Sequence, residues 1–137
     1  MGGQINYATT AFTPKDRNYH AQFWFARFSY FSSEAKDHQQ SLDVFDHIRN
    51  GRFSFEDRHK VRDFDGGENE PRIHSGTINR KREGFGFLIM DGTGYEIFVP
   101  AKQVKDDLWD AIKEGDRVSF NVAFSFSGPF AANLTPT

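Results

Sequence analysis

The chain has 137 residues, a formal net charge of −2 at pH 7 and no cysteine. This length suits one domain or two small ones, and the lack of cysteine excludes disulfides, thiolate catalysis and cysteine-ligated metals. No apolar run reaches the length of about 18 residues that a membrane-spanning helix needs, and the N-terminus lacks the basic and then apolar layout of a signal peptide, so we expect a cytoplasmic protein.

The N-terminal part is rich in aromatic residues and is predicted to form a small α+β region. Residues 19–31 favour a strand, because aromatic residues alternate partly along them. These residues are Phe23, Phe25, Phe28 and Tyr30. Ser41 is placed to cap a short helix that runs through Arg49 and stops before Gly51. Residues 52–55 alternate again and predict a further strand.

A break in composition comes next along the chain. Residues 63–71 read Asp-Phe-Asp-Gly-Gly-Glu-Asn-Glu-Pro and combine a double glycine, an acidic run and a proline. Such a segment is typical of a linker. We therefore expect a domain boundary near residue 70, with an N-terminal region of unknown role at residues 1–70 and a second domain at residues 73–137.

The second domain is predicted to be mainly β. Five short strands are predicted, at residues 76–82, 84–90, 95–99, 117–125 and 130–134. The third and fourth are joined by a long connection, in which residues 102–113 have helix-like apolar spacing and predict a turn or two of helix. Five strands in this order are typical of a small OB-type β-barrel.

Aromatic residues gather on two of these strands. Residues 84–88 read Gly-Phe-Gly-Phe-Leu, and residues 97–99 read Ile-Phe-Val. Alternation along a strand places Phe85 and Phe87 on one face. Large rings on a solvent-facing sheet are costly unless a partner stacks on them, and the glycines beside them would keep the surface low enough for a flat partner. Nucleobases bind aromatic platforms on small barrels in this way.

These strings belong to an ordered set of motifs that resembles the cold-shock domain. Residues 76–89 read Gly-Thr-Ile-Asn-Arg-Lys-Arg-Glu-Gly-Phe-Gly-Phe-Leu-Ile and are similar to its first two strands, and residues 97–99 stand where its second nucleic-acid motif lies. Glu-Gly-Asp-Arg-Val-Ser-Phe at 114–120 resembles the start of its fourth strand, and Gly-Pro-Phe-Ala-Ala-Asn-Leu at 128–134 its closing strand. The first loop is short, as in the cold-shock-like domains of ribonuclease R-type exonucleases and of the transcription terminator Rho.

The resemblance implies an OB barrel that binds single-stranded RNA, or less favourably DNA, as an RNA chaperone or a regulator of transcription or translation. Carried over position by position, Phe85, Phe87 and Phe98 match the stacking aromatics of the family, and Trp109 falls in the loop that usually holds another base-contacting ring. Three consecutive basic residues beside the aromatic strand are expected to contact phosphates. They are Arg80, Lys81 and Arg82.

Several alternatives stay open. The basic run could be a solvated hairpin tip, and Trp109 could pack its loop onto the barrel. The slightly acidic charge argues against binding dominated by phosphate neutralisation. The whole protein could instead be a protein-interaction module that has lost nucleic-acid binding, whose aromatic face contacts a partner or the phenylalanine-rich N-terminal region. That region is itself a candidate surface for a protein partner.

We expect no enzymatic activity, cofactor or metal. The five histidines are scattered, and none forms a ligand pair at helix spacing. The densest carboxylate cluster, at residues 106–110, lies on a charged segment and is read as a solvated helix face. A ribonuclease of the related exonuclease type would need grouped aspartates for magnesium on a large catalytic domain, for which this chain has no room.

Overall fold

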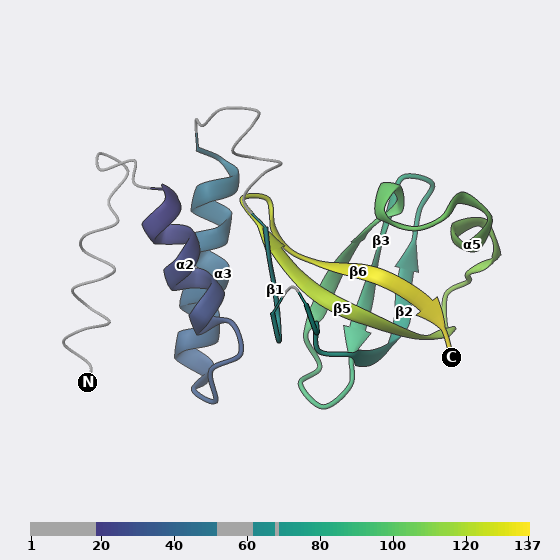
Figure 1. The fold of residues 1–137 in the computed structure, drawn as a ribbon, viewed down its shortest axis with the longest axis horizontal. Helices are drawn as coiled ribbons and strands as arrows, with labels where there is room; N and C mark the ends of the chain where they lie inside the picture. Colours follow the sequence, from purple (N-terminus) through teal and green to yellow (C-terminus); the bar gives the residue numbers. More distant parts are fainter. Residues whose placement is uncertain (1–18, 52–61, 68) are drawn as a thin grey trace. The chain divides into compact units, whose positions relative to one another are not determined.

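The computed structural model describes residues 19–51, 62–67 and 69–137, which fall into two compact units (Figure 1). The first unit spans residues up to Val61 together with Ser125–Gly128, and the second comprises Arg62–Phe124 and Pro129–Thr137. None of the helices in the described residues is long and apolar enough to cross a membrane.

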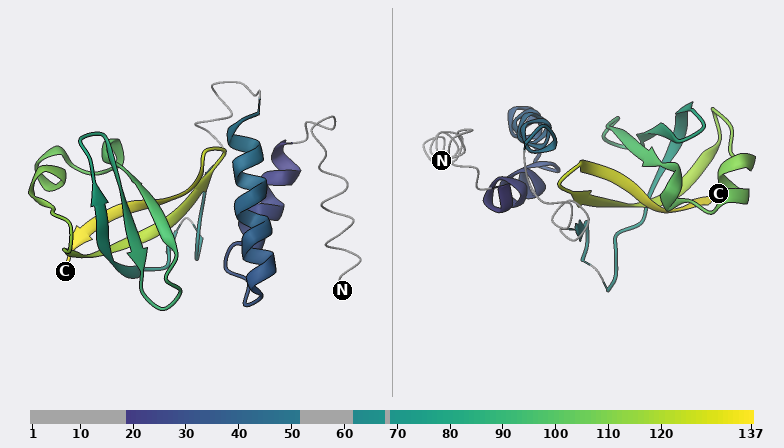
Figure 2. Two further views of the ribbon diagram at one scale, coloured as in Figure 1. Left: turned by 180° about the vertical axis from the view of Figure 1, so that it is seen from behind. Right: turned by 90° about the horizontal axis from the view of Figure 1, so that it is seen from above.

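Within residues 19–51 the first unit forms the helices α2 (Tyr19–Ser29) and α3 (Ala35–Arg49), which lie side by side (Figures 1 and 2). Phe23 of α2 is fully buried and meets Phe45 of α3 edge-on, with 6.1 Å between the ring centroids. Phe126, from the connection between the last two strands, is also fully buried, and its ring lies 5.7 Å from that of Phe23. Three phenylalanines from separate segments of the sequence therefore pack together in the core of this unit.

The strand predicted over residues 19–31 is wrong, because this segment forms α2. Phe23, Ala26 and Tyr30 are buried and recur at three- and four-residue spacing, as on one face of a helix. Trp24 and Phe28 lie on the opposite, exposed face. Since both faces carry aromatic rings, the combined pattern imitates the alternation of a strand.

The helix predicted in the N-terminal part is confirmed, but its predicted start was wrong. The helix α3 ends at Arg49 as expected and begins at Ala35 instead of near Ser41. Ser41 is buried inside the helix, and its hydroxyl donates a hydrogen bond to the carbonyl oxygen of Ala26 at 2.5 Å. It thus joins α3 to α2 instead of capping α3. The strand predicted at residues 52–55 lies outside the described residues.

The second unit is a closed barrel, as predicted. Its strands are β1 (Arg62–Phe64), β2 (His74–Lys81), β3 (Phe85–Met90), β4 (Glu96–Pro100), β5 (Arg117–Ser125) and β6 (Gly128–Pro136). They are hydrogen-bonded in the order β1-β5-β2-β3-β4-β6, and a further pairing of β5 with β6 closes the barrel from β2 to β6. The β4–β6 pair is parallel, whereas β2–β3, β2–β5 and β3–β4 are antiparallel.

Two parts of this unit differ in detail from the prediction. The short strand β1 lies at the start of the segment that was predicted as a linker, and it pairs with β5 at the edge of the sheet. The long connection between β4 and β5 holds a short 3-10 helix, Ala101–Gln103, and the helix α5, Asp106–Ala111. This connection carries Trp109, which is buried.

An ion pair joins the turn after β3 to the start of β5. Arg117 donates hydrogen bonds to both carboxylate oxygens of Asp91 and to Thr77 Oγ1 at 2.9 Å. The hydrogen bond from Arg117 lowers the pKa of Asp91, and the bond to Asp91 raises the pKa of Arg117. The pair therefore favours the charged form of both groups in the folded state.

We expect Asp91→Asn to destabilise the protein near neutral pH and to be almost neutral in acid. Because the folded-state pKa of Asp91 lies below its unfolded value, its stabilisation is fully present above the unfolded pKa of about 3.9 and disappears as the pH falls through the folded-state pKa. Urea denaturation of both proteins at neutral and acidic pH measures this. The exposed Glu96→Gln serves as the matched control, and an Asp91→Asn effect that is independent of pH would contradict the prediction.

Candidate nucleic-acid interface

Three rings from neighbouring strands form one surface, which we call the aromatic surface. It consists of Phe85 and Phe87 on β3 and Phe98 on β4. Phe85 and Phe98 are each 39% exposed and nearly parallel, with ring centroids 6.2 Å apart and an angle of 27° between the planes. Phe87 is half-buried and meets both edge-on, at 84° to Phe85 and 63° to Phe98. The surface therefore offers two parallel exposed rings, with a third ring that supports them from the side.

Strand alternation and register produce this arrangement. Phe87 is directly paired with Phe98 in the antiparallel β3–β4 ladder, so the two rings share one face of the sheet. Their neighbours Gly86, Leu88, Ile97 and Val99 are buried on the opposite face. A one-residue slip would reverse both faces, and the fully buried aliphatic side chains prevent it.

The two glycines of the aromatic strand have different roles. Gly86 is buried, and a Cβ atom added there would lie 2.6 Å from the carbonyl oxygen of Arg80 and 2.9 Å from Trp109 Cη2. Its missing side chain thus allows β2 and Trp109 to approach from the inside, which differs from the expectation that it clears space for a flat ligand. Gly84 is exposed, and an added Cβ would meet no atom within 4 Å.

Gly86→Ala is expected to lower the free energy of unfolding by about 1–3 kcal/mol, the usual cost of overpacking. The contact that limits it is a backbone oxygen, which cannot move away as a flexible side chain would. Gly84→Ala provides a matched control and should stay within about 0.5 kcal/mol of the wild type. Urea denaturation followed by circular dichroism compares the two. Equal stabilities would show that Gly86 is not needed for packing.

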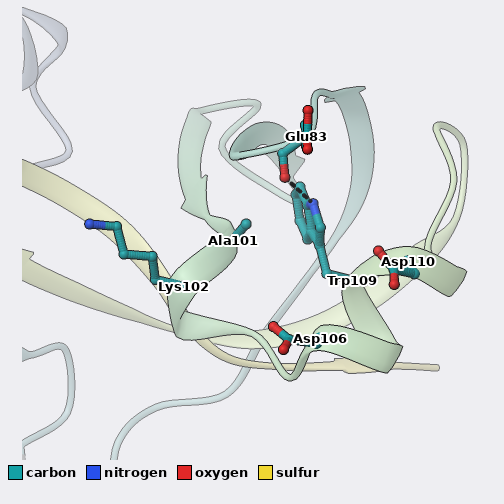
Figure 3. Close-up of a pocket in the computed structure, with 6 residues that line it drawn as sticks. All are labelled: Glu83, Ala101, Lys102, Asp106, Trp109 and Asp110. Atoms are coloured by element: carbon teal, nitrogen blue, oxygen red, sulfur yellow. Dashed lines mark hydrogen bonds between the residues drawn. The ribbon is translucent and has the colours of Figure 1, made fainter.

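Trp109 lies on the inner side of β3, opposite the aromatic surface. It is only 5% exposed, and its indole nitrogen donates to the carbonyl oxygens of Arg82 at 3.2 Å and Glu83 at 3.0 Å. Figure 3 shows the bond to Glu83. Its ring edge faces the Cα of Gly86 from the side away from Phe85 and Phe87. The structure therefore does not bring this predicted base-contacting ring together with the other three.

The three residues predicted to contact phosphates likewise lie in different places. Arg80 is exposed and is the cross-strand partner of Phe87, and its guanidinium carbon lies 5.7 Å from the centroid of that ring. The ammonium of Lys81 donates to the carbonyl oxygen of Ile112 at 2.7 Å and lies over the ring of Trp109. Arg82 donates to the carbonyl oxygen of Lys81 at 2.9 Å. Of these three side chains, that of Arg80 lies over a ring of the aromatic surface.

The placement of Arg80 depends on a bulge that the sequence pattern does not reveal. Ile78 pairs with Leu88, and continued regular pairing would set Arg80 opposite Gly86, on the buried face. The register shifts between Ile78 and Arg80, so that Arg80 pairs with Phe87 and faces outward. A bulge inserts one extra residue and thereby reverses the face on which the next residues of the strand lie.

Comparison with known proteins identifies the barrel. The model of the 'Cold-shock' DNA-binding domain family matches residues 74–137. Cold shock protein ScoF of Streptomyces coelicolor is 33% identical over 64 residues, which are 45% of this chain and 96% of that protein. Cold shock-like protein CspA of Vibrio cholerae is 40% identical over 53 residues, which are 39% of this chain and 76% of that protein. The chain belongs to the cold-shock domain family.

Membership of the cold-shock domain family supports nucleic-acid binding in general, and this family is not one of enzymes. The aromatic surface, the bulge at Asn79 and the buried Trp109 all lie within the matched residues. Residues 1–73 lie outside the match. The comparison therefore concerns the barrel alone.

Beside the aromatic surface, the cold-shock domain has an acidic hollow of about 390 Å³ (Figure 3). Its lining residues are Glu83, Ala101, Lys102, Asp106, Trp109 and Asp110. Three carboxylates and one ammonium give this hollow a net negative charge, which repels phosphate. Ala101 follows Pro100, the cross-strand partner of Phe85, so the hollow lies next to that end of the aromatic surface.

Proposed function

We propose that the cold-shock domain binds single-stranded nucleic acid, with RNA preferred to DNA, by stacking bases on Phe85 and Phe98. The observation that carries the proposal is the pair of parallel, exposed phenylalanine rings on a sheet surface. Exposed rings of this kind are stacking platforms for bases of any sequence. Phe87 supports the two rings, and Arg80 supplies positive charge beside them.

The proposed contact set omits Trp109, since its ring is buried and hydrogen-bonded on the other side of β3. Binding is assigned to residues 73–137, and residues 1–70 are given no part in it. By analogy with the family, the protein acts in the cytoplasm as an RNA chaperone or as a regulator of transcription or translation. The proposed activity is binding, without catalysis.

The affinity is expected to be modest and weakly dependent on salt. Each stacked base contributes about 1–3 kcal/mol, so the two exposed rings account for about 2–6 kcal/mol of the roughly 8 kcal/mol that micromolar affinity represents. Lys81 and Arg82 are engaged by backbone carbonyls, and Arg82 lies 3.7 Å from a carboxylate oxygen of Glu114. Because few cations are left to neutralise phosphates, the release of counterions adds little.

Titration of the whole protein with fluorescein-labelled oligouridine and oligothymidine of equal length tests this function. We expect saturable binding, tighter for the RNA, with a shallow salt dependence between low and physiological ionic strength. Intrinsic tryptophan fluorescence should change little, because Trp109 is buried away from the aromatic surface. Absence of binding at tens of micromolar by a correctly folded protein would refute the proposal.

The second candidate function is a protein-interaction module. The observation that favours it is the pair Trp24 and Phe28, which are 40% and 71% exposed on α2 and stack with their ring centroids 5.8 Å apart. Large exposed apolar rings often mark a protein contact. On this hypothesis the aromatic surface also serves a protein partner. Oligonucleotides would then fail to bind, whereas Phe28→Ser and Phe98→Ser would each release a partner that crosslinks to the wild type.

A further inference from the structure

The side chain of Arg80 covers the one ring of the aromatic surface that is not itself well exposed. Its guanidinium carbon lies 5.7 Å from the centroid of Phe87, within the range of a cation–π contact. Phe87 is half-buried between Phe85 and Phe98, which it meets edge-on. A base that approached Phe87 would therefore meet the guanidinium first.

We propose that Arg80 forms the third stacking platform of the interface, with Phe87 as the support beneath it. This inference rests on the proposed function. A guanidinium is planar and weakly hydrated, and it stacks on aromatic faces. The guanidinium carbon of Arg80 lies over the Phe87 ring, and the residue is exposed, so solvent and ligand can reach its outer side. A base stacks on that outer face, while the in-plane N–H groups point sideways, where they can donate to a phosphate of the same strand.

Register and backbone geometry hold Arg80 in this position. The bulge between Ile78 and Arg80 turns the side chain outward, and Arg80 then pairs directly with Phe87, whose partner on the other side is Phe98 of β4. Rings or planar groups from β2, β3 and β4 thus form one row across the sheet. A row of this kind accommodates consecutive bases of one strand.

The two neighbouring basic residues cannot fill this role. The Lys81 ammonium is held by the carbonyl oxygen of Ile112 at 2.7 Å, over Trp109 on the inner side of β3. Arg82 donates to the carbonyl oxygen of Lys81 and lies near Glu114. A lysine at position 80 would keep the charge but not the plane, since its ammonium is a compact point charge. Arg80→Lys therefore tests the planar shape of the side chain separately from its charge.

The test measures the affinity of the whole protein and of its Arg80→Lys variant for labelled oligouridine. The same affinities are measured for a series of oligouridines, each with one abasic site at a different position. We expect Arg80→Lys to weaken binding of the intact strand about fivefold or more, the loss of one stacked base. The salt dependence should be unchanged, because the charge is kept. One abasic position should weaken the wild type but not the variant, which is the coupling that a double-mutant cycle detects. Arg82→Lys is the matched control and should change affinity less than about twofold.

Wild-type affinity in Arg80→Lys, or an abasic penalty that persists in it at every position, would show that Arg80 acts through its charge alone and would overturn the proposal. The variant Phe85→Ala/Phe98→Ala separates this result from failure of the function itself. If that double variant binds as the wild type does, then the aromatic surface is not the site and both proposals fall. If it loses binding while Arg80→Lys does not, then only the role of Arg80 is refuted.

Discussion

Replacement of both Phe85 and Phe98 by alanine is expected to weaken oligonucleotide binding by about 2–6 kcal/mol, a loss of roughly thirtyfold or more. The two rings are the exposed, parallel members of the aromatic surface, so each substitution removes one stacking platform. Fluorescence anisotropy with labelled oligouridine at physiological salt measures the change. Stability should decrease much less than for a core phenylalanine, since both rings already contact solvent.

A matched control distinguishes this effect from a general loss of aromatic surface. Phe28 is 71% exposed on α2 and lies outside the barrel. Phe28→Ala should therefore leave the oligonucleotide affinity unchanged within about twofold. If Phe28→Ala weakens binding as much as the double variant does, then the strand does not bind at the aromatic surface alone.

The barrel could be predicted from the sequence because its strands follow simple alternation. Leu88, Ile97 and Val99 face the core, and Phe85 and Phe98 face outward, as a period of two requires. Glycine-containing turns mark where strands end. These local signals agree with the tertiary packing, so the order of the strands and the outward aromatic residues were predicted together.

The N-terminal helix α2 could not be predicted in this way, because it carries large aromatic residues around most of its circumference. Phe23 is fully buried, whereas Trp24 and Phe28 are exposed. Periodicity separates a helix from a strand only when one face is polar. The deciding partner of Phe23 is Phe126, which is more than 100 residues away in the sequence, and no local pattern points to it.

At the site itself, the sequence predicted the face of the phenylalanines but not the faces on which Arg80 and Trp109 lie. Arg80 reaches Phe87 only because of the bulge, and Trp109 reaches the inner side of β3 only because Gly86 lacks a side chain. Both are effects of backbone geometry between segments that are distant along the chain. The charged residues also lie in two places: Arg80 lies on the aromatic surface, whereas Glu83 and Asp110 line the acidic hollow with Trp109.

Trp109→Ala is expected to lower the free energy of unfolding by about 3–5 kcal/mol, the usual cost of removing a large buried ring. The indole packs against Gly86 and under Lys81, and its nitrogen holds the backbone carbonyls of Arg82 and Glu83. Its loss leaves a cavity and frees the loop that leads into Phe85. Urea denaturation followed by circular dichroism, with hydrogen exchange of the amides of β2 and β3, measures the change.

The decisive comparison is between stability and affinity in the same variants. Because Trp109 lies on the opposite side of β3 from Phe85 and Phe87, Trp109→Phe should lose stability yet bind oligouridine within a few-fold of the wild type under conditions where it is folded. Phe85→Ala/Phe98→Ala should lose affinity for oligouridine while its stability changes much less. A Trp109→Phe variant that keeps its stability but loses binding would mean that the indole contacts a base. Opposite responses in these two variants would assign Trp109 to the fold and the two phenylalanines to the ligand.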